Sequence, residues 1–343
     1  MSSYDFTDHL PTDFSAAGLR ADVLNGLRAQ PKWLPPKWFY DKTGSALFEE
    51  ITRLPEYYPT RVERSILEQS AASIVARAGC RELVELGSGS SEKTRLLLDQ
   101  LPATGSAYVA LDVSESALRL AAESVSAEYP RLRVEVVRAD FEKQLGTVLS
   151  ESRRATSSDR SGRREELSNE PGRRMVAFLG GTIGNLAPSE RREFLAELHA
   201  GLLPGDAFLL GADLVKSPQI LVPAYDDAAG VTAAFNLNVL EVLNRRLAAD
   251  FDRDDFEHVA IWDAENAWIE MRLRAVRAVS VRVAELGLDL SFAAGEEMRT
   301  EISAKFTRER LETEFAAAGF TGVGWWTDPA AQFSLSLWTT PPS

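Results

Sequence analysis

The chain of 343 residues is 45% hydrophobic and 26% charged, a composition typical of a globular protein of about two domains. Its 51 acidic and 38 basic residues leave a net charge of −13. This negative charge disfavours binding to nucleic acid, which depends on basic side chains that displace counterions from phosphates. Small molecules are therefore the partners that we expect.

No feature of the sequence predicts export or membrane insertion. The N-terminus has no basic leader followed by an apolar stretch, and no window holds about 18 uncharged apolar residues. Cys80 is the single cysteine; it precedes an apolar strand, so we expect a buried, unreactive thiol and a reducing compartment. His9, His199 and His258 lie far apart, without metal-ligand spacing. The sequence thus predicts a cytoplasmic monomer without a metal site.

The first half of the chain alternates between helical and extended patterns. After a helix expected over 14–30, the segment 32–61 contains four prolines and many aromatic residues, which indicates a packed binding segment rather than a linker. The elements expected next are a helix over 61–78, a strand over 82–86, a helix from 92, a strand over 108–113, a helix over 114–128, strands over 134–137 and 175–179, a helix over 189–203 and a strand over 207–212. Such alternation predicts an α/β fold with a doubly wound, Rossmann-like parallel sheet.

The stretch 151–174 interrupts this pattern. It holds seven arginines, five acidic residues and one large apolar residue, so it has too little apolar surface to order itself. We expect a mobile surface insertion. A regulatory or docking segment is the alternative, but the mixed charge and the lack of aromatic residues favour a solvated loop.

From 216 to 305 the pattern changes to helices, over 223–228 and 231–247, followed by strands over 267–275 and 279–285. This change predicts a second, smaller α+β domain. The last strands, over 322–327 and 333–339, flank a DPAA turn and are expected to pair antiparallel. A terminal antiparallel hairpin on a parallel sheet is the usual ending of class I methyltransferases.

A glycine-rich turn, Glu85-Leu-Gly87-Ser-Gly89, follows the first strand of the expected sheet. Glycines at this position let the backbone approach a ligand closely. Dinucleotide-binding folds carry a third glycine, but Glu92 occupies its place here, and a carboxylate would repel a diphosphate. S-adenosylmethionine carries no phosphate and is cationic at sulfur, so the acidic turn favours that ligand over a nicotinamide nucleotide.

Two further polar sites follow the next two strands. Asp112 comes 23 residues after Gly89, where its carboxylate could accept hydrogen bonds from both ribose hydroxyls. Asp140-Phe141 offers an acceptor for the adenine amine and a ring against its face. Each feature alone could be a turn or a helix cap. Their order along successive strand ends indicates a cofactor site, because open α/β sheets bind ligands at the carboxyl edge.

Several longer motifs then identify a family. They are Lys37-Trp-Phe-Tyr-Asp41, Leu54-Pro-Glu-Tyr-Tyr-Pro-Thr60, Glu85-Leu-Gly-Ser-Gly89, Phe178-Leu-Gly-Gly-Thr-Ile-Gly-Asn185, Tyr225-Asp-Asp-Ala-Ala-Gly230 and Ala294-Gly-Glu-Glu-Met298. The chain resembles, over almost its whole length, the histidine Nα-methyltransferases of ergothioneine biosynthesis. The resemblance implies a methyltransferase domain over 61–215 and 306–343, and an amino-acid domain over 13–60 and 216–305.

The resemblance also implies which residues bind S-adenosylmethionine. They are Tyr40, Gly87, Ser88, Lys93, Asp112, Asp140 and Phe141. Without the resemblance, Lys93 would be interpreted as a solvated helix lysine. The chain departs from the family pattern in a longer 151–174 insertion and in Gly181, where serine is common.

The amino-acid pocket follows from the same resemblance. Asn185 and Tyr225 would hold the α-carboxylate, and Tyr57 would accept a hydrogen bond from the α-amine as the catalytic orienting residue. Glu301 and Ser303 would bind the imidazole, since residues two apart in an extended stretch face the same side. The remaining lining residues would be Phe48, Thr182, Thr232 and Met271.

The implied reaction is transfer of three methyl groups to the α-amine of L-histidine, through mono- and dimethylated intermediates, giving the trimethylbetaine hercynine. One alternative is the same chemistry on tryptophan or another aromatic amino acid. Glu301 argues against it, because an indole donates a single hydrogen bond and leaves a buried carboxylate poorly paired. The other alternative is a nucleotide-binding module without catalysis.

Overall fold

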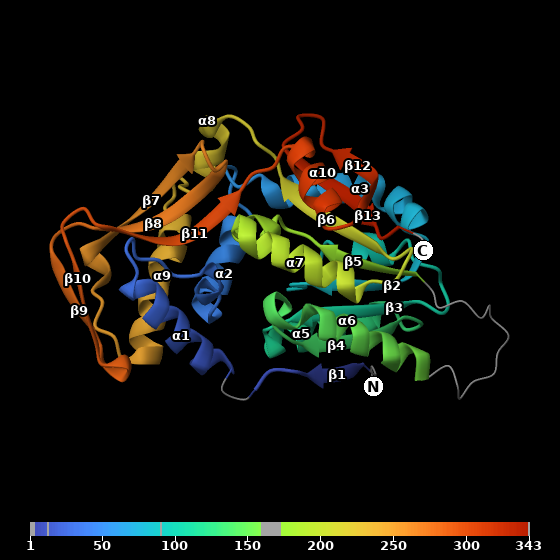
Figure 1. Ribbon diagram of the computed structural model, residues 1–343, viewed down its shortest axis with the longest axis horizontal. Helices are drawn as coiled ribbons and strands as arrows, with labels where there is room; N and C mark the ends of the chain where they lie inside the picture. The colour runs from blue at the N-terminus through green and yellow to red at the C-terminus, as the bar shows by residue number, and fades with distance from the viewer. Residues whose placement is uncertain (1–3, 12–13, 90, 159–172, 342–343) are drawn as a thin grey trace.

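The computed structural model describes residues 4–11, 14–89, 91–158 and 173–341, and its larger part is built on an eight-stranded sheet (Figure 1). The strand order is β1-β4-β3-β2-β5-β6-β13-β12; β1 to β6 run parallel, and β12 and β13 form an antiparallel hairpin beside β6. The bounds are Asp5–Asp8 for β1, Cys80–Leu86 for β2, Ala107–Asp112 for β3, Arg133–Arg138 for β4, Arg173–Phe178 for β5, Ala207–Asp213 for β6, Thr321–Thr327 for β12 and Phe333–Thr339 for β13. The predicted doubly wound sheet with a terminal hairpin is confirmed.

Helices cover both faces of this sheet because its strands are apolar on both sides. Along β2, Val84 and Leu86 pack on one face while Leu83 packs on the other. The first face is covered by α6 (Phe141–Ser158), α7 (Pro188–Gly201) and α10 (Arg308–Ala317), and the second by α3 (Pro59–Ala78), α4 (Arg95–Leu98) and α5 (Glu115–Glu128). In open α/β sheets of this kind, ligands bind at the carboxyl ends of the parallel strands.

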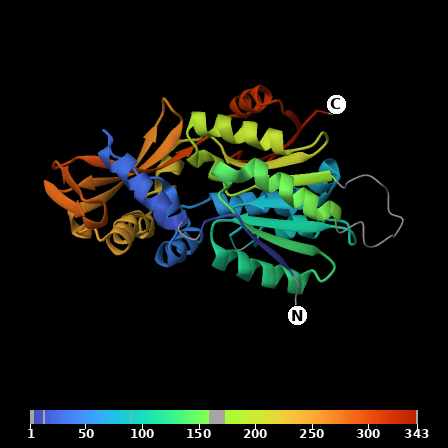
Figure 2. The same ribbon diagram turned by 60° about the horizontal axis from the view of Figure 1, so that its bottom comes forward.

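The remaining elements form a second lobe beside the sheet (Figures 1 and 2). It contains a three-stranded antiparallel sheet, β11-β8-β7, and the hairpin β9-β10. Its elements are α1 (Phe14–Arg28), η1 (Pro36–Phe39), α2 (Lys42–Ile51), α8 (Pro218–Leu221), η4 (Val222–Ala224), α9 (Val231–Leu247), η5 (Arg253–Asp255), β7 (Phe256–Asp263), β8 (Trp268–Ala275), β9 (Val279–Val283), η6 (Ala284–Leu286), β10 (Leu288–Phe292) and β11 (Glu297–Ala304).

The hydrophobic cores follow these two lobes. One buried cluster takes all its residues from 19–58 and 221–298, whereas the two clusters on the faces of the large sheet come mainly from 66–212 and 304–338. Two stretches that are distant in sequence therefore share one core. We propose the two-domain division on this basis.

Several predicted elements differ from those observed. The helix expected over 223–228 is only the short 3-10 turn η4, because the Asp227 carboxylate accepts the N–H groups of Val231 and Thr232 and so caps α9 instead. The helix expected from 92 is the four-residue α4. Residues 151–158 of the expected insertion continue α6 and 173–174 begin β5, while 159–172 lie outside the described residues.

The environment of Cys80 and the lengths of the helices bear on two further expectations from the sequence. Cys80 is buried, and burial raises the pKa of its thiol to about 12, as expected for an unreactive cysteine. In the described ranges, no helix has the length and apolar character needed to cross a bilayer.

Candidate active site

The glycine-rich turn after β2 folds over the end of β3. Gly87 and Gly89 have φ angles of 65° and 48°, a backbone region that glycine adopts without strain. The N–H of Gly87 donates to the carbonyl of Leu111 at 2.8 Å, and that of Gly89 to the Asp112 carboxylate at 3.3 Å. Burial raises the pKa of Asp112, and the N–H groups of Ser114 and Gly89 oppose that shift. The turn and the acidic strand end thus form one cradle.

The cradle contains a polar group that the protein itself leaves unsatisfied. The Ser88 hydroxyl is buried and has no hydrogen-bond partner in the described structure. Nearby, Asp140 is buried and the Phe141 ring packs edge-on against Phe178 at 5.3 Å. A buried hydroxyl without a partner is costly unless a ligand bonds it. These residues fit a ligand with ribose hydroxyls and a flat base, such as S-adenosylmethionine.

Lys93 is not the solvated lysine that its position in the sequence alone suggests. Its ammonium group pairs with Glu63, whose side chain is fully buried. The other oxygen of Glu63 accepts the N–H of Gly180 at 2.8 Å. Glu63 thus links Lys93, which follows the glycine-rich turn, to the loop after β5.

Five aromatic rings from segments of the second lobe form a continuous group. Tyr40 contacts Phe48 at 5.5 Å, Phe48 contacts Tyr57 at 6.2 Å, and Tyr57 contacts Tyr225 at 6.4 Å between ring centroids. Phe235 of α9 lies against Tyr40 at 5.6 Å and Phe48 at 6.0 Å. Tyr40, expected with the cofactor residues, therefore joins the aromatic residues expected around the amine. Such a group favours a cation at its centre.

Polar residues from three segments meet beside these rings. The Tyr225 and Ser303 hydroxyls lie 2.8 Å apart, and the Asn185 side chain lies near enough to Glu301 to lower the pKa of its carboxyl group. Burial raises the pKa of Glu301 to about 7, although Lys305 and Asn185 oppose the shift. At neutral pH this carboxyl group is therefore poised to give or take a proton.

Close backbone packing brings Asn185 to Glu301. Asn185 ends the 3-10 helix η3 (Thr182–Asn185), which packs directly on β11. A Cβ atom at Gly184 would lie 2.8 Å from the carbonyl oxygen of Ala304, so only glycine permits this approach. The Gly184-Asn185 sequence thus positions the Asn185 amide beside β11, the strand that carries Glu301.

Tyr57 carries a neutral phenol. Burial raises its pKa well above the ordinary value, and Tyr225 and Glu301 raise it further. A neutral phenol is a weak base, but its oxygen can accept a hydrogen bond from a neighbouring N–H group.

The buried side chain of His258 hydrogen-bonds the backbone of Tyr225. The His258 Nε2–H donates to the carbonyl oxygen of Tyr225 at 2.8 Å, and the Asn236 amide donates to Nδ1 at 2.8 Å. Burial lowers the pKa of His258, which keeps the ring neutral. The two hydrogen bonds fix its tautomer and hold the Tyr225 backbone.

The remaining predicted residues lie in three different environments. Met271 is buried in β8 opposite Glu301, and Thr232 is buried in the first turn of α9. Thr182 is exposed on η3 and its hydroxyl donates to the carbonyl of Leu179 at 3.3 Å. All three belong to segments that contribute to the site.

Sequence reasoning missed Phe235 and a group of buried charges. Phe235 follows Thr232 by three residues on α9, a spacing that places both on one helical face, so a signal existed. This group comprises the charged side chains of Asp213, Lys216 and Lys305, together with the Tyr58 hydroxyl that is bonded to Asp213. No local pattern announces it, because its members come from distant strand ends and loops.

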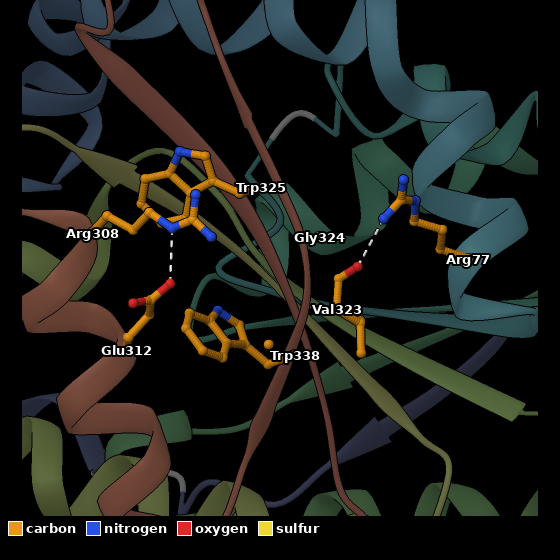
Figure 3. A pocket seen from close by; sticks show the side chains of 8 residues that line it. Arg77, Arg308, Glu312, Val323, Gly324, Trp325 and Trp338 are labelled. Carbon is orange, nitrogen blue, oxygen red and sulfur yellow. Dashed lines mark hydrogen bonds and ion pairs between the residues drawn. The ribbon is translucent and has the colours of Figure 1, made fainter.

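A separate hollow of about 400 Å³ lies at the C-terminal hairpin, away from these residues (Figure 3). Its arginines are bonded within the chain: Arg77 donates to the carbonyl of Val323, and Arg308 pairs with Glu312. Over the described part of the chain, no three His, Cys, Asp or Glu side chains gather as metal ligands would.

Comparisons with known proteins show which family the chain belongs to. The family model described as "Histidine-specific methyltransferase, SAM-dependent" matches residues 19–340. Histidine N-alpha-methyltransferase from Mycolicibacterium smegmatis is 53% identical, covering 96% of this chain and 97% of that protein; the Mycobacterium tuberculosis protein of the same name is 49% identical with the same coverage. Ergothioneine biosynthesis protein 1 from Schizosaccharomyces pombe is 28% identical over 72% of this chain and 31% of its own length. The chain belongs to the family of histidine-specific methyltransferases that depend on S-adenosylmethionine.

Proposed function

We propose that this protein transfers three methyl groups from S-adenosylmethionine to the α-amine of L-histidine and releases hercynine for ergothioneine biosynthesis. One observation carries the proposal: donors and acceptors suited to each part of histidine converge beside the aromatic group. They are Tyr57, Asn185, Tyr225, Glu301 and Ser303. The name of the fission yeast relative supports the pathway.

Each part of histidine has a matching partner. Asn185 and Tyr225 carry amide and hydroxyl donors for the α-carboxylate. Glu301 and Ser303 offer a carboxyl group and a hydroxyl to the two ring nitrogens. The pKa of Glu301, about 7, is close to that of an imidazole, so one proton is readily shared between them.

S-adenosylmethionine supplies the electrophilic methyl group. The protein contributes by holding the amine nitrogen in place, and such positioning is worth roughly 7 to 11 kcal/mol in favourable cases. While the neutral amine still carries a hydrogen, the Tyr57 oxygen accepts its N–H, which aims the nitrogen lone pair toward the donor. The neutral dimethylated amine has no N–H and is oriented by the carboxylate and imidazole contacts. Because Tyr57 stays a neutral phenol, solvent takes the proton that the ammonium form of each amine loses before its methyl transfer.

Trimethylation requires the site to accept an amine that grows and gains a fixed positive charge. The rings of Tyr40, Phe48 and Phe235 supply apolar surface and electron-rich faces for this group. The mono- and dimethylated intermediates keep the carboxylate and imidazole contacts. Each therefore returns to the same orientation for the next transfer.

Mass spectrometry after incubation of the protein with S-adenosylmethionine and each free amino acid tests the proposal. Histidine should gain three methyl groups. Methylation of tryptophan with no reaction on histidine would contradict the roles of Glu301 and Ser303, and leave the methyl-transfer chemistry standing. A histidine product that stops at one or two methyl groups would contradict trimethylation alone.

A further inference from the structure

A buried carboxylate at the end of β6 lies between two lysines. The Lys216 ammonium contacts one oxygen of Asp213 at 2.6 Å, and the Lys305 ammonium contacts the other at 2.9 Å. Burial alone would raise the pKa of Asp213, but the two ammonium groups bring it below its ordinary value. Asp213 therefore stays ionised and fixes both lysines.

The two lysines hold different hydroxyl groups. Lys216 donates to the Tyr58 hydroxyl at 2.7 Å. Lys305 donates to the hydroxyls of Tyr225 and Ser303, each at 2.8 Å. With Asp213 as its third partner, the fully buried Lys305 has used all three of its N–H donors.

These contacts restrict where the hydroxyl protons point. The Tyr225 and Ser303 oxygens both accept from Lys305 and lie 2.8 Å from each other, so one hydroxyl donates to the other. A single O–H donor then remains for a ligand. If Tyr225 gives it to the α-carboxylate, the Ser303 proton points to Tyr225, and the Ser303 oxygen accepts a ring N–H.

We propose that Lys305 is a positioning residue, which orients the hydroxyls of Tyr225 and Ser303 so that Tyr225 donates to the carboxylate and Ser303 accepts from the imidazole. This inference rests on the proposed function. It adds a residue that contacts no substrate atom and acts through the two hydroxyls. Without the ammonium group, either hydroxyl could point its proton in either direction, and binding would select among several arrangements.

The test compares Lys305→Met with Lys216→Met. Both substitutions remove one ammonium group from Asp213, but only the first removes a donor to Tyr225 and Ser303. Lys305→Met should raise the KM for histidine roughly tenfold or more, with a smaller change in kcat and unchanged affinity for S-adenosylhomocysteine. Lys216→Met should leave the KM within about threefold of the unmodified protein. Equal increases in both variants would overturn the inference.

A substitution cycle separates positioning from general destabilisation. In a Tyr225→Phe, Ser303→Ala background, Lys305→Met should raise the KM by less than about threefold, since both hydroxyls through which it acts are gone. Full additivity of the two effects would contradict the proposal. If Lys305→Met fails to fold, Lys305→Met with Asp213→Asn leaves no unpaired carboxylate, and the same two KM comparisons decide the question.

The two proposals fail in distinguishable ways. An unmodified protein that does not methylate histidine contradicts the proposed function, and the inference fails with it. An active unmodified protein in which Lys305→Met and Lys216→Met behave alike contradicts only the role of Lys305.

Discussion

A glutamate lies in each half of the site, Glu85 buried and Glu301 half-buried, and desolvation raises the pKa of both carboxyl groups to about 7. Their surroundings differ. The oxygens of Glu85 accept hydrogen bonds from Thr94 and from Tyr108, so both are satisfied by the chain. Among the described residues, Glu301 has no such pair of short side-chain hydrogen bonds; Lys305 and Asn185 lower the pKa of its carboxyl group from nearby.

This difference separates a structural carboxyl group from one that awaits a ligand. Glu85 lies at the start of the glycine-rich turn, and both of its carboxylate oxygens already accept hydrogen bonds from the chain. Glu301 keeps acceptor capacity in a site where desolvation is costly, and such a group is stabilised when a ligand supplies the missing donors. Comparable pKa values therefore do not imply comparable roles.

The strongest test of this comparison is Glu301→Gln. The substitution removes a charged hydrogen-bond acceptor, so kcat/KM for histidine should fall roughly 10- to 150-fold. Affinity for S-adenosylhomocysteine, measured by calorimetry, should not change. Glu297→Gln is the matched control, because Glu297 lies on the same strand but pairs with Arg272 and Arg274. An equal loss of activity in both variants would contradict the assignment.

The pH dependence of stability gives the second test. The native pKa of Glu301, about 7, lies above its usual value of 4.5, so the native state binds this proton more tightly than the unfolded chain does. Its contribution is complete below pH 4.5 and is lost as the pH rises to 7, up to about 3 kcal/mol. Denaturant unfolding at pH 5 and 8 should show that Glu301→Gln loses less stability between these pH values than the unmodified protein.

Glu85→Gln sharpens the same measurement. Its amide N–H₂ would face the donors Thr94 and Tyr108, so this variant should be less stable than the unmodified protein at pH 8. Glu301→Gln should be at least as stable as the unmodified protein there. If both variants lose the same stability at pH 8, the two glutamates do not differ in the way described.

A smaller effect is expected from Tyr57→Phe. Loss of a neutral hydrogen-bond acceptor for the amine should lower kcat roughly three- to tenfold at saturating substrate. The adjacent Tyr58 provides the control, since its hydroxyl bonds Asp213 and Lys216 instead. Tyr58→Phe should lower the melting temperature and leave kcat nearly unchanged. An unaltered kcat in Tyr57→Phe would exclude its orienting role.

The two halves of the site also differ in how far the sequence predicts them. The cofactor side follows three consecutive strand ends, at Gly87-Ser88-Gly89, Asp112 and Asp140, so local patterns and one topological rule locate it. The four-residue β1 was missed because it becomes a strand only by pairing with β4. Local reasoning works where each part of the structure is determined by its own segment.

The amino-acid side is assembled from contacts between distant segments. Glu301 and Ser303 look like ordinary polar residues in the sequence, and only the family resemblance drew attention to them. Neither β7 nor β11 was predicted as a strand. For β7 the reason is that the strand is partly exposed along most of its length and lacks an alternating pattern. The pairing of Asp213 with Lys305 depends on the approach of the two lobes and leaves no local trace.

Ser88→Ala tests the cofactor side with the smallest expected effect. The Ser88 hydroxyl is buried without a partner, so its removal should leave the stability of the ligand-free protein unchanged or slightly higher. If the hydroxyl bonds the ligand, affinity for S-adenosylhomocysteine should fall roughly three- to tenfold, and the melting-temperature increase caused by that ligand should shrink. Histidine KM should stay constant, because Ser88 lies on the opposite half of the site. A variant with unchanged ligand affinity would mean that the hydroxyl is unsatisfied in both states, and that the backbone of the glycine-rich turn and Asp112 recognise the ligand without it.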